Sequence, residues 1–394
     1  MKICLMNNLY PPYQKGGAET VVRMAAEAFL KEGDEVFIVS TRPSTGAAKE
    51  LDARVPVYRV SSRYYDLDTM PVFFRLFWHL IDMFDLVMAY KLYKIFIQEK
   101  PDLVITHNLK GVSYLVPALL HFMKIFHIHT LHDIQLIHPS GLMFYGKEEL
   151  IRSWSARFYQ AFCRLLFSSP DVVISPSAWL LYLYESLGFF PNSIKKTLRN
   201  PVARTRGNIQ AANENSEGFF TFLFVGQMEE HKAPRDVVRA YSSLPADIAA
   251  GTKLRLVGDG KLAVELKEME FDARIKFVGK LPLEGVYSEL QNADCLVVPS
   301  LCYENSPTVI YEAIASGTPF IASDLGGITE LANEYGGILF KPGDIEDLSR
   351  AMSRMKQGYS DHEKKILESK AKVLRLNPSF YANEIKRLFQ TSKK

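Results

Sequence analysis

Two glutamates, Glu304 and Glu312, stand in the stretch YENSPTVIYEA (303–313) with seven residues between them. An ionised carboxylate accepts two hydrogen bonds at once, which suits the paired hydroxyls of a vicinal diol. A helix that begins between the two glutamates would suit a phosphate, because its first N–H groups carry a partial positive charge. A phosphate flanked by two diols describes a nucleoside diphosphate sugar. The alternative interpretation is a solvated pair of glutamates on a loop and a helix face.

The neighbouring elements are predicted to hold these residues in place. The apolar run 293–300 is typical of a buried strand, so Glu304 falls on the loop at its carboxyl end. Helical spacing runs over 308–316, with Ser306 expected as the N-cap and Pro307 at the first helical position. Glu312 would then lie about 7–8 Å along the helix axis from its start.

Length and composition restrict the class of protein. The chain has 394 residues, which favours two domains, and its 47% apolar and 23% charged content is that of a globular protein. A net charge of +3 gives no argument for a nucleic-acid partner. The cysteines form no C-x-x-C pair, and Cys4 and Cys295 fall in apolar runs, which favours free thiols in a reducing compartment.

No signal peptide or membrane span is expected, and we predict a cytoplasmic location. The most apolar region, 72–97, carries Arg75, Asp82, Asp85 and Lys91, so it is interpreted as one helix with a wide apolar stripe. Core packing is the first interpretation of that stripe, and a membrane-facing or acceptor-facing surface is the second.

Strands and helices alternate along both halves of the chain. Expected strands are 2–7, 35–41, 101–108, 126–133, 170–177, 220–227, 253–260, 275–281, 293–300 and 318–324. Expected helices are 19–31, 113–122, 178–187, 234–244, 261–269, 284–291 and 308–316. This alternation predicts two Rossmann-like, doubly wound parallel sheets, joined by the polar linker 203–218. Ligands of such sheets bind beyond the carboxyl ends of the strands. The residues of interest that fall there are Gly16, Gly17, His132, Gly226, Gly279 and Glu304, and we expect the ligand in a cleft between the halves.

Several short motifs then occur in an order that resembles one family. They are PPYQKGGAETVV (11–22), TLHDIQLIHPSG (130–141), FVGQMEEHKAPRDVVRAY (224–241), LVGDGK (256–261), FVGKL (277–281), YENSPTVIYEAIASGTPFIASDLGGITEL (303–331) and GGILFKPGDIEDL (336–348). Together the chain resembles the retaining glycosyltransferases of family 4 over nearly its full length. The resemblance implies the GT-B fold, with two Rossmann-like domains facing a central cleft. It also implies an N-terminal acceptor domain (1–202), a C-terminal nucleotide-sugar domain (219–372) and a last segment (373–394) that packs back on the first domain.

The resemblance also assigns roles to residues. Lys232 would neutralise the diphosphate as leaving-group charge grows, Glu312 would hold the ribose diol, and Glu304 would face the sugar hydroxyls. His132 would contact the donor sugar, with Asp133 orienting it or its loop. The catalytic set is therefore His132, Lys232 and Glu304. The expected donor-binding set is Gly16, Gly17, Gly226, Gln227, Lys232, Val278, Lys280, Leu281, Glu304, Ser306, Pro307, Thr308, Val309 and Glu312.

Two positions depart from the family pattern. Gln227 stands where an arginine is usual, which removes one cation from the phosphate site, and Ala233 stands where glycine is usual. Lys232, His231 and Arg235 are the neighbours that could compensate. The change at Gln227 keeps open a homologue that binds nucleotide sugars with impaired catalysis.

Three other motifs suggest different chemistry. His127, His129, His132 and His138 have a spacing compatible with a metal-dependent hydrolase. The D-x-D at 66–68 matches metal-using glycosyltransferases but follows a polar stretch, where a loop is expected. Gly258 and Gly260 resemble part of a dinucleotide fingerprint, without the acidic residue that should end the next strand.

The sequence thus predicts a metal-independent hexosyltransferase that needs no cofactor, and the resemblance implies that the enzyme retains the anomeric configuration. Its donor would be a UDP- or GDP-sugar, and its acceptor a glycan or lipid-linked glycan in surface polysaccharide or glycolipid assembly. The aromatic-rich stretch 73–93 would fit a peripheral contact with the inner membrane face.

Overall fold

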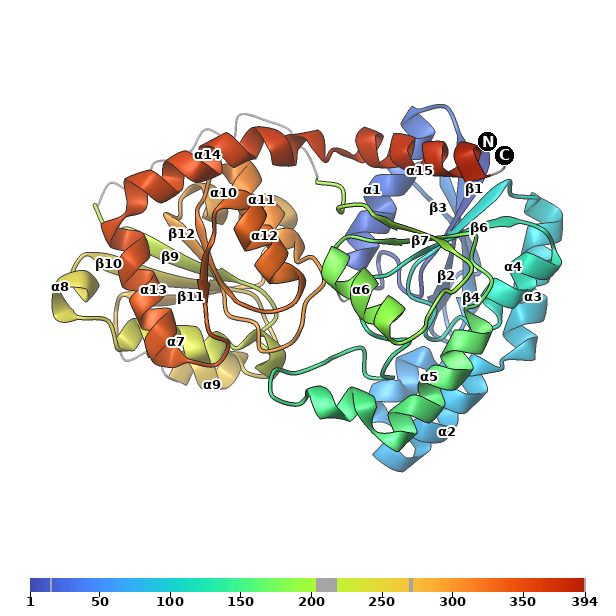
Figure 1. The fold of residues 1–394 in the computed structure, drawn as a ribbon, viewed down its shortest axis with the longest axis horizontal. Coiled ribbons are helices and arrows are strands. Elements are labelled where there is room, and N and C mark those ends of the chain that lie inside the picture. Colours follow the sequence, from blue (N-terminus) through green and yellow to red (C-terminus); the bar gives the residue numbers. More distant parts are fainter. Residues whose placement is uncertain (15, 203–217, 269–271, 393–394) are drawn as a thin grey trace. The chain divides into compact units, whose positions relative to one another are not determined.

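The computed structural model describes residues 1–14, 16–202, 218–268 and 272–392. The chain forms two compact units, each shown in Figure 1. Unit 1 contains Met1–Leu142, Glu149–Pro201 and Pro378–Lys394, and unit 2 contains Met143–Glu148 and Val202–Asn377. Residues 143–148 and Val202, which we expected in the N-terminal domain, belong to unit 2, as do residues 373–377, which we expected in the last segment. The predicted linker 203–218, apart from Gly218, lies outside the described residues.

Unit 1 is built on an eight-stranded sheet in the order β3-β4-β2-β1-β5-β6-β7-β8. Its strands are β1 (Lys2–Met6), β2 (Glu35–Arg42), β3 (Lys49–Asp52), β4 (Val55–Ser61), β5 (Leu103–Thr106), β6 (Phe126–Thr130), β7 (Val172–Ser175) and β8 (Ile194–Thr197). The β3–β4 pair is antiparallel, and the other pairs are parallel. Sequence reasoning did not predict β3, β4 or β8.

The helices of unit 1 come from three separate parts of the chain. They are α1 (Ala18–Lys31), η1 (Arg63–Thr69), α2 (Val72–Met83), α3 (Leu86–Glu99), α4 (Val116–Phe122), η2 (Glu148–Arg152), α5 (Trp154–Leu166), α6 (Ala178–Ser186) and α15 (Pro378–Ser392), where η marks a 3-10 helix. The D-x-D at 66–68 therefore lies in a 3-10 helix rather than in the loop that we expected.

The prediction of one helix over 72–97 is wrong. The helix ends at Met83, and Asp85 begins a new one by accepting a hydrogen bond from the Met88 N–H at 2.8 Å. An aspartate at this position satisfies a backbone donor that the first turn of a helix cannot pair internally. The expected helix start at Ser113 is also wrong, because α4 begins at Val116.

One face of the unit 1 sheet is covered by α1 and α15. Alternate strand residues such as Ile3, Leu5 and Ile128 pack there with Tyr381 and Ile385 of α15 in one buried cluster. The Phe389 ring meets Phe126 edge-on, with ring centroids 5.1 Å apart. The last helix is thus part of the unit 1 core.

Unit 2 is built on a six-stranded parallel sheet in the order β11-β10-β9-β12-β13-β14. Its strands are β9 (Phe220–Val225), β10 (Thr252–Val257), β11 (Ile275–Gly279), β12 (Cys295–Val298), β13 (Phe320–Ser323) and β14 (Ile338–Phe340). The first five were predicted, and the short β14 was not. Side chains alternate across the sheet, so Phe222 and Phe224 lie in one core cluster and Leu223 in the other.

Helices cover both faces of this second sheet (Figure 1). They are η3 (Glu230–Lys232), α7 (Pro234–Ser242), α8 (Ala246–Ala249), α9 (Ala263–Glu268), α10 (Leu283–Gln291), α11 (Thr308–Ser316), α12 (Gly327–Tyr335), α13 (Ile345–Gln357) and α14 (Tyr359–Arg375). Residues of α7 and α13 share one cluster, and residues of α10, α11, α12 and α14 share the other.

Each sheet has one point where the strand order reverses. In unit 1 it lies between β1 and β5, and in unit 2 between β9 and β12. Loops that leave the carboxyl ends of such neighbouring strands diverge and leave a crevice for a ligand. Among the described residues, no helix is both long and apolar enough to cross a bilayer.

Candidate active site

The loops at the reversal point of unit 2 bring Lys232 and Glu304 together. Lys232 ends η3, shortly after β9, and Glu304 lies six residues beyond the end of β12. Their Nζ and Oε2 atoms are 2.7 Å apart, and the two side chains are only 25% and 13% exposed. Lys232, predicted to neutralise the diphosphate, and Glu304, predicted to face the sugar hydroxyls, are therefore direct ion-pair partners.

Further bonds fix the Glu304 loop. The Ser300 hydroxyl donates to Glu304 Oε1, and the Gly327 N–H donates to the Glu304 carbonyl at 2.9 Å. The Leu301 N–H donates to the His231 carbonyl at 2.9 Å, which ties the β12 loop to η3. Sequence reasoning did not single out Ser300. Its position at the end of the apolar run, four residues before Glu304, is the signal that could have found it.

The ion pair keeps both groups charged. Burial alone would raise the pKa of Glu304, but the positive charge of Lys232 lowers it below its usual range. Burial would likewise lower the pKa of Lys232, and the charge of Glu304 raises it above its usual range. A buried charge is costly without an opposite partner, so each residue maintains the ionisation of the other.

Helix α11 begins four residues after Glu304, and its first turn could bind an anion. It starts at Thr308 with Pro307 at the N-cap, and within the described residues no side chain caps it. The predicted Ser306 cap is wrong, because the Ser306 hydroxyl instead lies 2.7 Å from the Tyr311 hydroxyl. The first backbone donors of a helix lack internal partners, so those of Thr308 and Val309 suit a phosphate oxygen.

Glu312 lies one turn into α11 with a different environment from Glu304. Burial raises the pKa of Glu312 to about 7, and a hydrogen bond from Thr308 opposes that shift only in part. The side chain is partly exposed, so a ligand can reach it. A carboxyl group that titrates near neutrality accepts two hydroxyl donors only after it loses its proton.

The neighbours of Gln227 do not replace the missing arginine charge. The Arg235 guanidinium is bonded to Glu265, with Nε 2.6 Å from Oε1, and also to Glu230. Burial, with the charge of Lys232 beside it, lowers the pKa of His231, so this imidazole is neutral at pH 7. Of the three residues that we considered as compensation, His231 is thus uncharged, and Arg235 and Lys232 are each paired with glutamate.

Glycines allow the loops after β9 and β10 to touch. Gly258 has φ +144°, and a Cβ atom there would lie 1.8 Å from the Gly226 carbonyl oxygen. A Cβ atom on Gly260 would lie 2.6 Å from the Met228 carbonyl oxygen. These glycines thus permit close packing of two loops at the strand ends, which accounts for the motif that resembled a dinucleotide fingerprint.

The segment after β11 lies at the same carboxyl edge. Gly279 ends the strand, and its carbonyl accepts a bond of 2.9 Å from the Gly258 N–H. Val278 and Leu281 are partly buried against the core, and Lys280 is exposed. The backbone here is therefore held in register with the glycine loops.

In unit 1, two histidines meet at the ends of adjacent strands. His107 follows β5 and His132 follows β6, and their Nδ1 and Nε2 atoms are 2.7 Å apart. The rings stack with centroids 5.0 Å apart. Burial lowers the pKa of His132 to about 4, and burial also lowers that of His107 well below its usual range. Both are neutral at pH 7, so one imidazole donates its N–H to the other.

His107 was not predicted as a site residue. The sequence signal was its place directly after an apolar strand, two residues beyond Ile105. The carboxylate of the neighbouring Asp133 turns to its own loop, where Oδ1 accepts a bond of 2.7 Å from the Gln135 N–H. Burial raises the pKa of Asp133 to about 6. This side chain therefore orders the loop, which is one of the two roles expected for it.

The other histidines of the predicted cluster have local partners. His127 Nε2 and His129 Nδ1 lie 2.7 and 2.8 Å from the Thr106 hydroxyl, and His138 Nδ1 lies 2.7 Å from the Ser140 hydroxyl. Across the part of the chain that the structure describes, no three His, Cys, Asp or Glu side chains are grouped to hold a metal ion. The spacing of these histidines thus has a structural explanation.

The glycine loop before α1 differs from its prediction. The Gly16 N–H donates to the Glu19 carboxylate at 3.2 Å, and Glu19 is buried. One of the N–H groups that we assigned to a phosphate is therefore occupied by a side chain. Gly17 takes the N-cap position with ordinary right-handed backbone angles.

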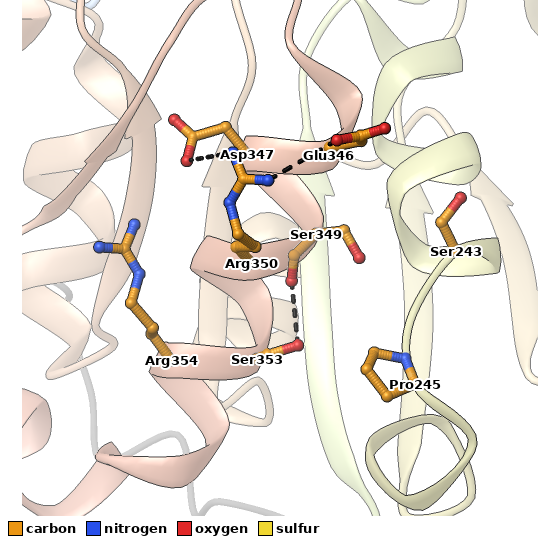
Figure 2. Close-up of a pocket in the computed structure, with 8 residues that line it drawn as sticks. All are labelled: Ser243, Pro245, Glu346, Asp347, Ser349, Arg350, Ser353 and Arg354. Atoms are coloured by element: carbon orange, nitrogen blue, oxygen red, sulfur yellow. Dashed lines mark hydrogen bonds and ion pairs between the residues drawn. The ribbon is translucent and has the colours of Figure 1, made fainter.

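A separate hollow of about 550 Å³ lies on unit 2, along α13 (Figure 2). Its lining includes Ser243, Glu346, Asp347 and Arg350, and none of the predicted site residues. Arg350 is paired with both acids, at 3.3 Å to Asp347 and 3.7 Å to Glu346. Nothing in its chemistry connects this hollow to the residues at the strand ends.

Comparison with known proteins gives the family. Residues 15–202 match the family described as Glycosyltransferase Family 4, and residues 205–372 match Glycosyl transferases group 1. The chain belongs to glycosyltransferase family 4. The family 4 enzyme has the GT-B fold. Its two α/β units and its similarity to solved glycosyltransferase structures both support this assignment.

Three known proteins are similar to this chain in sequence or in fold. A Klebsiella pneumoniae "uncharacterized 42.6 kDa protein in cps region" is 28% identical, covering 93% of this chain and 96% of its own. An Escherichia coli UDP-Gal:alpha-D-GlcNAc-diphosphoundecaprenol alpha-1,3-galactosyltransferase is 27% identical over 70% of each chain. The crystal structure of Anabaena HepE in complex with UDP-glucose has a TM-score of 0.71 at 15% identity, covering 99% of this chain and all of that one.

Proposed function

We propose that this protein transfers a hexose from a UDP- or GDP-sugar to an acceptor hydroxyl with retention of configuration and without a metal ion. The observation that carries the proposal is the ion pair between Lys232 and Glu304, whose atoms are 2.7 Å apart. The pair lies where the strand order of unit 2 reverses, and Glu304 is four residues before the start of α11. A cation and a carboxylate on loops near the start of this helix would suit the phosphates and hydroxyls of a nucleotide sugar.

The donor class is supported by chemistry and by relatives. Lys232 and the first N–H groups of α11 would neutralise a diphosphate, while Glu312 would accept the hydroxyls of a ribose. Anabaena HepE was crystallised with UDP-glucose, and the E. coli relative carries UDP-Gal in its name. We expect the β11 end, from Val278 to Leu281, to contact the base.

In the proposed reaction, the bond between the anomeric carbon and the diphosphate oxygen breaks. The electron pair leaves with the nucleoside diphosphate, whose growing charge Lys232 and the α11 start would stabilise. The acceptor hydroxyl then attacks from the same face, and its proton passes to the departing phosphate. Glu304 would hold the sugar hydroxyls, and His132, kept neutral by burial, would serve as a hydrogen-bonding partner of the sugar.

We further propose a glycan or lipid-linked glycan acceptor in surface polysaccharide or glycolipid assembly, at the cytoplasmic face of a membrane. One relative is named for a cps region, and another for transfer to a diphosphoundecaprenol-linked sugar. Such an acceptor would be presented at a bilayer surface, which favours a peripheral membrane contact.

A second candidate is a homologue that binds nucleotide sugars with impaired catalysis. The observation in its favour is that Gln227 replaces a cation while Arg235 is already paired with two glutamates. In that case nucleotides would bind, and no transfer or hydrolysis of the sugar would occur.

The test is a thermal-shift screen of EDTA-treated protein with UDP, GDP, ADP and their sugars, alongside Glu312→Ala. Binding raises the melting temperature by mass action, so one nucleotide should stabilise the wild type and not the variant. NMR of the product formed with the matching sugar should show retained anomeric configuration. No shift with any nucleotide would refute the donor assignment, and an inverted product would refute retention.

A further inference from the structure

Helix α5 of unit 1 presents an apolar stripe outward. Trp154, Phe158 and Leu165 are 84%, 60% and 70% exposed, and with Ala161 they follow helical spacing along one face. The opposite face is buried and includes Gln160, whose amide donates to the carbonyls of Ile137 and Ile151. The most apolar side chains of this helix therefore face away from the core.

Helix α2 continues the same apolar surface. Phe77, Ile81 and Phe84 are 54%, 61% and 43% exposed at helical spacing. Phe84 meets Phe162 of α5 edge-on, with ring centroids 5.8 Å apart, and Phe162 meets Phe158 at 4.8 Å. Figure 1 shows α2 beside α5. We call this area the α2–α5 surface and define it by Phe77, Ile81, Phe84, Trp154, Phe158 and Leu165.

The start of α3 extends the α2–α5 surface. Leu86 and Val87 are 74% and 66% exposed and follow Phe84 directly. Exposed apolar residues are ordinary when scattered, but a contiguous group on adjacent helices marks an interaction site.

The charges around this surface are mostly positive. From Leu150 to Pro170 the sequence contains Arg152, Arg157 and Arg164 and no acidic residue; Arg152 pairs with the exposed Glu149 at 3.9 Å, and Arg164 donates to the Leu187 carbonyl at 3.1 Å. On α3, the exposed charges that follow Val87 include Lys91 and Lys94. Two acids of this region are bonded to backbone N–H groups.

Asp82 is buried and accepts two bonds from the Gly111 N–H, at 3.0 and 2.9 Å. Asp85 caps α3 at 2.8 Å from the Met88 N–H. Neither carboxyl group therefore offsets the basic side chains beside the apolar stripe.

We propose that the α2–α5 surface docks on an anionic lipid bilayer, with its aromatic side chains in the interface and its arginines and lysines at the headgroups. An amphipathic helix with a basic polar side and Trp, Phe and Leu on the other side has this property. A second copy of the chain fits less well, because a symmetric contact would bring the same arginines together. The inference rests on the proposed function, since a membrane-borne acceptor gives a reason for the enzyme to dock there.

The experiment is flotation of the full chain with vesicles of phosphatidylcholine alone or with about a third phosphatidylglycerol. Wild type should float with the anionic vesicles and lose binding at high salt. The triple variant Trp154→Gln, Phe158→Gln, Leu165→Gln should bind at least about 100-fold more weakly, because three inserted side chains are removed. Glutamine preserves helix propensity and these positions are exposed, so the fold should be unchanged.

A matched control changes three exposed apolar residues elsewhere. Tyr182, Val264 and Leu367 are 71%, 71% and 52% exposed on α6, α9 and α14. Their replacement by glutamine should leave vesicle binding within about twofold of wild type. Equal loss in both triple variants, or wild type that does not float, would overturn the proposal.

Two further readouts separate the alternatives. Trp154 fluorescence should shift to shorter wavelength on the vesicles and be quenched by brominated lipid; an unchanged spectrum would contradict insertion. Sedimentation that shows a wild-type dimer and a monomeric triple variant would assign the surface to self-association instead. Nucleotide-induced thermal shifts measured without vesicles test the donor site separately, so loss of flotation with intact nucleotide binding would refute only the membrane surface.

Discussion

The two units stabilise buried polar side chains in opposite ways, one as a charged pair and the other as a neutral pair. At the reversal point of unit 2, Lys232 and Glu304 are both charged and 2.7 Å apart. At the strand ends of unit 1, His107 and His132 are also 2.7 Å apart, but burial keeps both imidazoles neutral. The comparison shows that burial removes a charge unless an opposite charge lies within hydrogen-bond distance.

In the proposed reaction, this difference in charge would suit the two units to different chemical roles. A leaving diphosphate needs a fixed positive charge, which unit 2 provides. A neutral sugar needs hydrogen-bond donors and acceptors without charge, which neutral imidazoles provide. The following predictions test whether the contrast between a charged and a neutral site holds.

Removing the charge of Lys232 should have the largest effect. Lys232→Ala should lower kcat for sugar transfer by about 100- to 1,000-fold, the usual range when one stabilising group for transition-state charge is lost. It also leaves Glu304 without its cation, so the melting temperature should fall. Lys261→Ala, at an 86%-exposed lysine of the same unit, is the control and should stay near wild type. Normal turnover by Lys232→Ala would show that the charged site is not catalytic.

Acid should weaken unit 1 before unit 2. Burial lowers the pKa of His127 to about 3, so between pH 6.5 and about 3 the unfolded chain binds a proton that the folded chain does not, and stability falls as pH falls. The Glu312 pKa of about 7 has the opposite sign, because between about 7 and 4.5 the folded state binds the extra proton. Acidification from pH 6.5 to 4.5 should thus increase the opening of unit 1 by up to about 50-fold for His127 alone.

The buried thiols provide a probe for each unit. Cys4 and Cys163 lie in unit 1, and Cys295 and Cys302 lie in unit 2. Their labelling by a disulfide reagent that works in acid, followed by mass spectrometry, should show unit 1 opening first. His127→Gln should make the pH dependence in unit 1 shallower. Earlier labelling of the unit 2 thiols would contradict the comparison.

Nucleotide affinity should rise with pH through Glu312. With a pKa of about 7, its ionised fraction grows about tenfold from pH 6 to pH 8, and diol binding needs the ionised form. The dissociation constant for the matching nucleoside diphosphate, measured by calorimetry, should fall by up to about tenfold over that range. Glu312→Gln should bind weakly with no such dependence. A parallel pH dependence in wild type and variant would assign the titration to another group.

Restoring the cation at position 227 should have the smallest effect. Gln227 is exposed and Arg235 is committed to Glu230 and Glu265, so Gln227→Arg should add a positive charge near the phosphate site. Donor affinity should improve by about three- to tenfold, with more dependence on salt. Gln357→Arg, at another exposed glutamine of unit 2, should change nothing. Unchanged affinity in Gln227→Arg would mean that the side chain lies outside the reach of the diphosphate.

Local features that depend on one residue type, such as a glycine that ends a helix, were predicted well from the sequence. Helix α11 spans the predicted 308–316, and Gly317 ends it in the left-handed conformation. The prediction that Ser306 caps the helix is wrong because its hydroxyl contacts the Tyr311 hydroxyl instead. Only the folded loop brings these two side chains together. In the apolar run 72–97, the sequence does not distinguish one continuous helix from two helices that are separated at Asp85, because both fit the same pattern of apolar residues.

Contacts between strands were the features that the sequence could not supply. His107 and His132 meet because β5 and β6 are neighbours in the sheet, and that order depends on the whole topology. The Lys232–Glu304 pair likewise joins residues 72 positions apart, across β9 and β12. Sequence reasoning found three of these four residues by type and position, without finding that they touch in pairs.

The helix α15 has a consequence for how the chain is made. Five residues of α15 belong to the same buried cluster as β1, β2 and β5, so unit 1 has no complete core until this helix has been synthesised; they are Tyr381, Ala382, Ile385, Leu388 and Phe389. Unit 2, which ends at Asn377, can close first. During synthesis, unit 1 therefore emerges first but completes its core last, because the helix that covers one face of its sheet follows unit 2 in the chain.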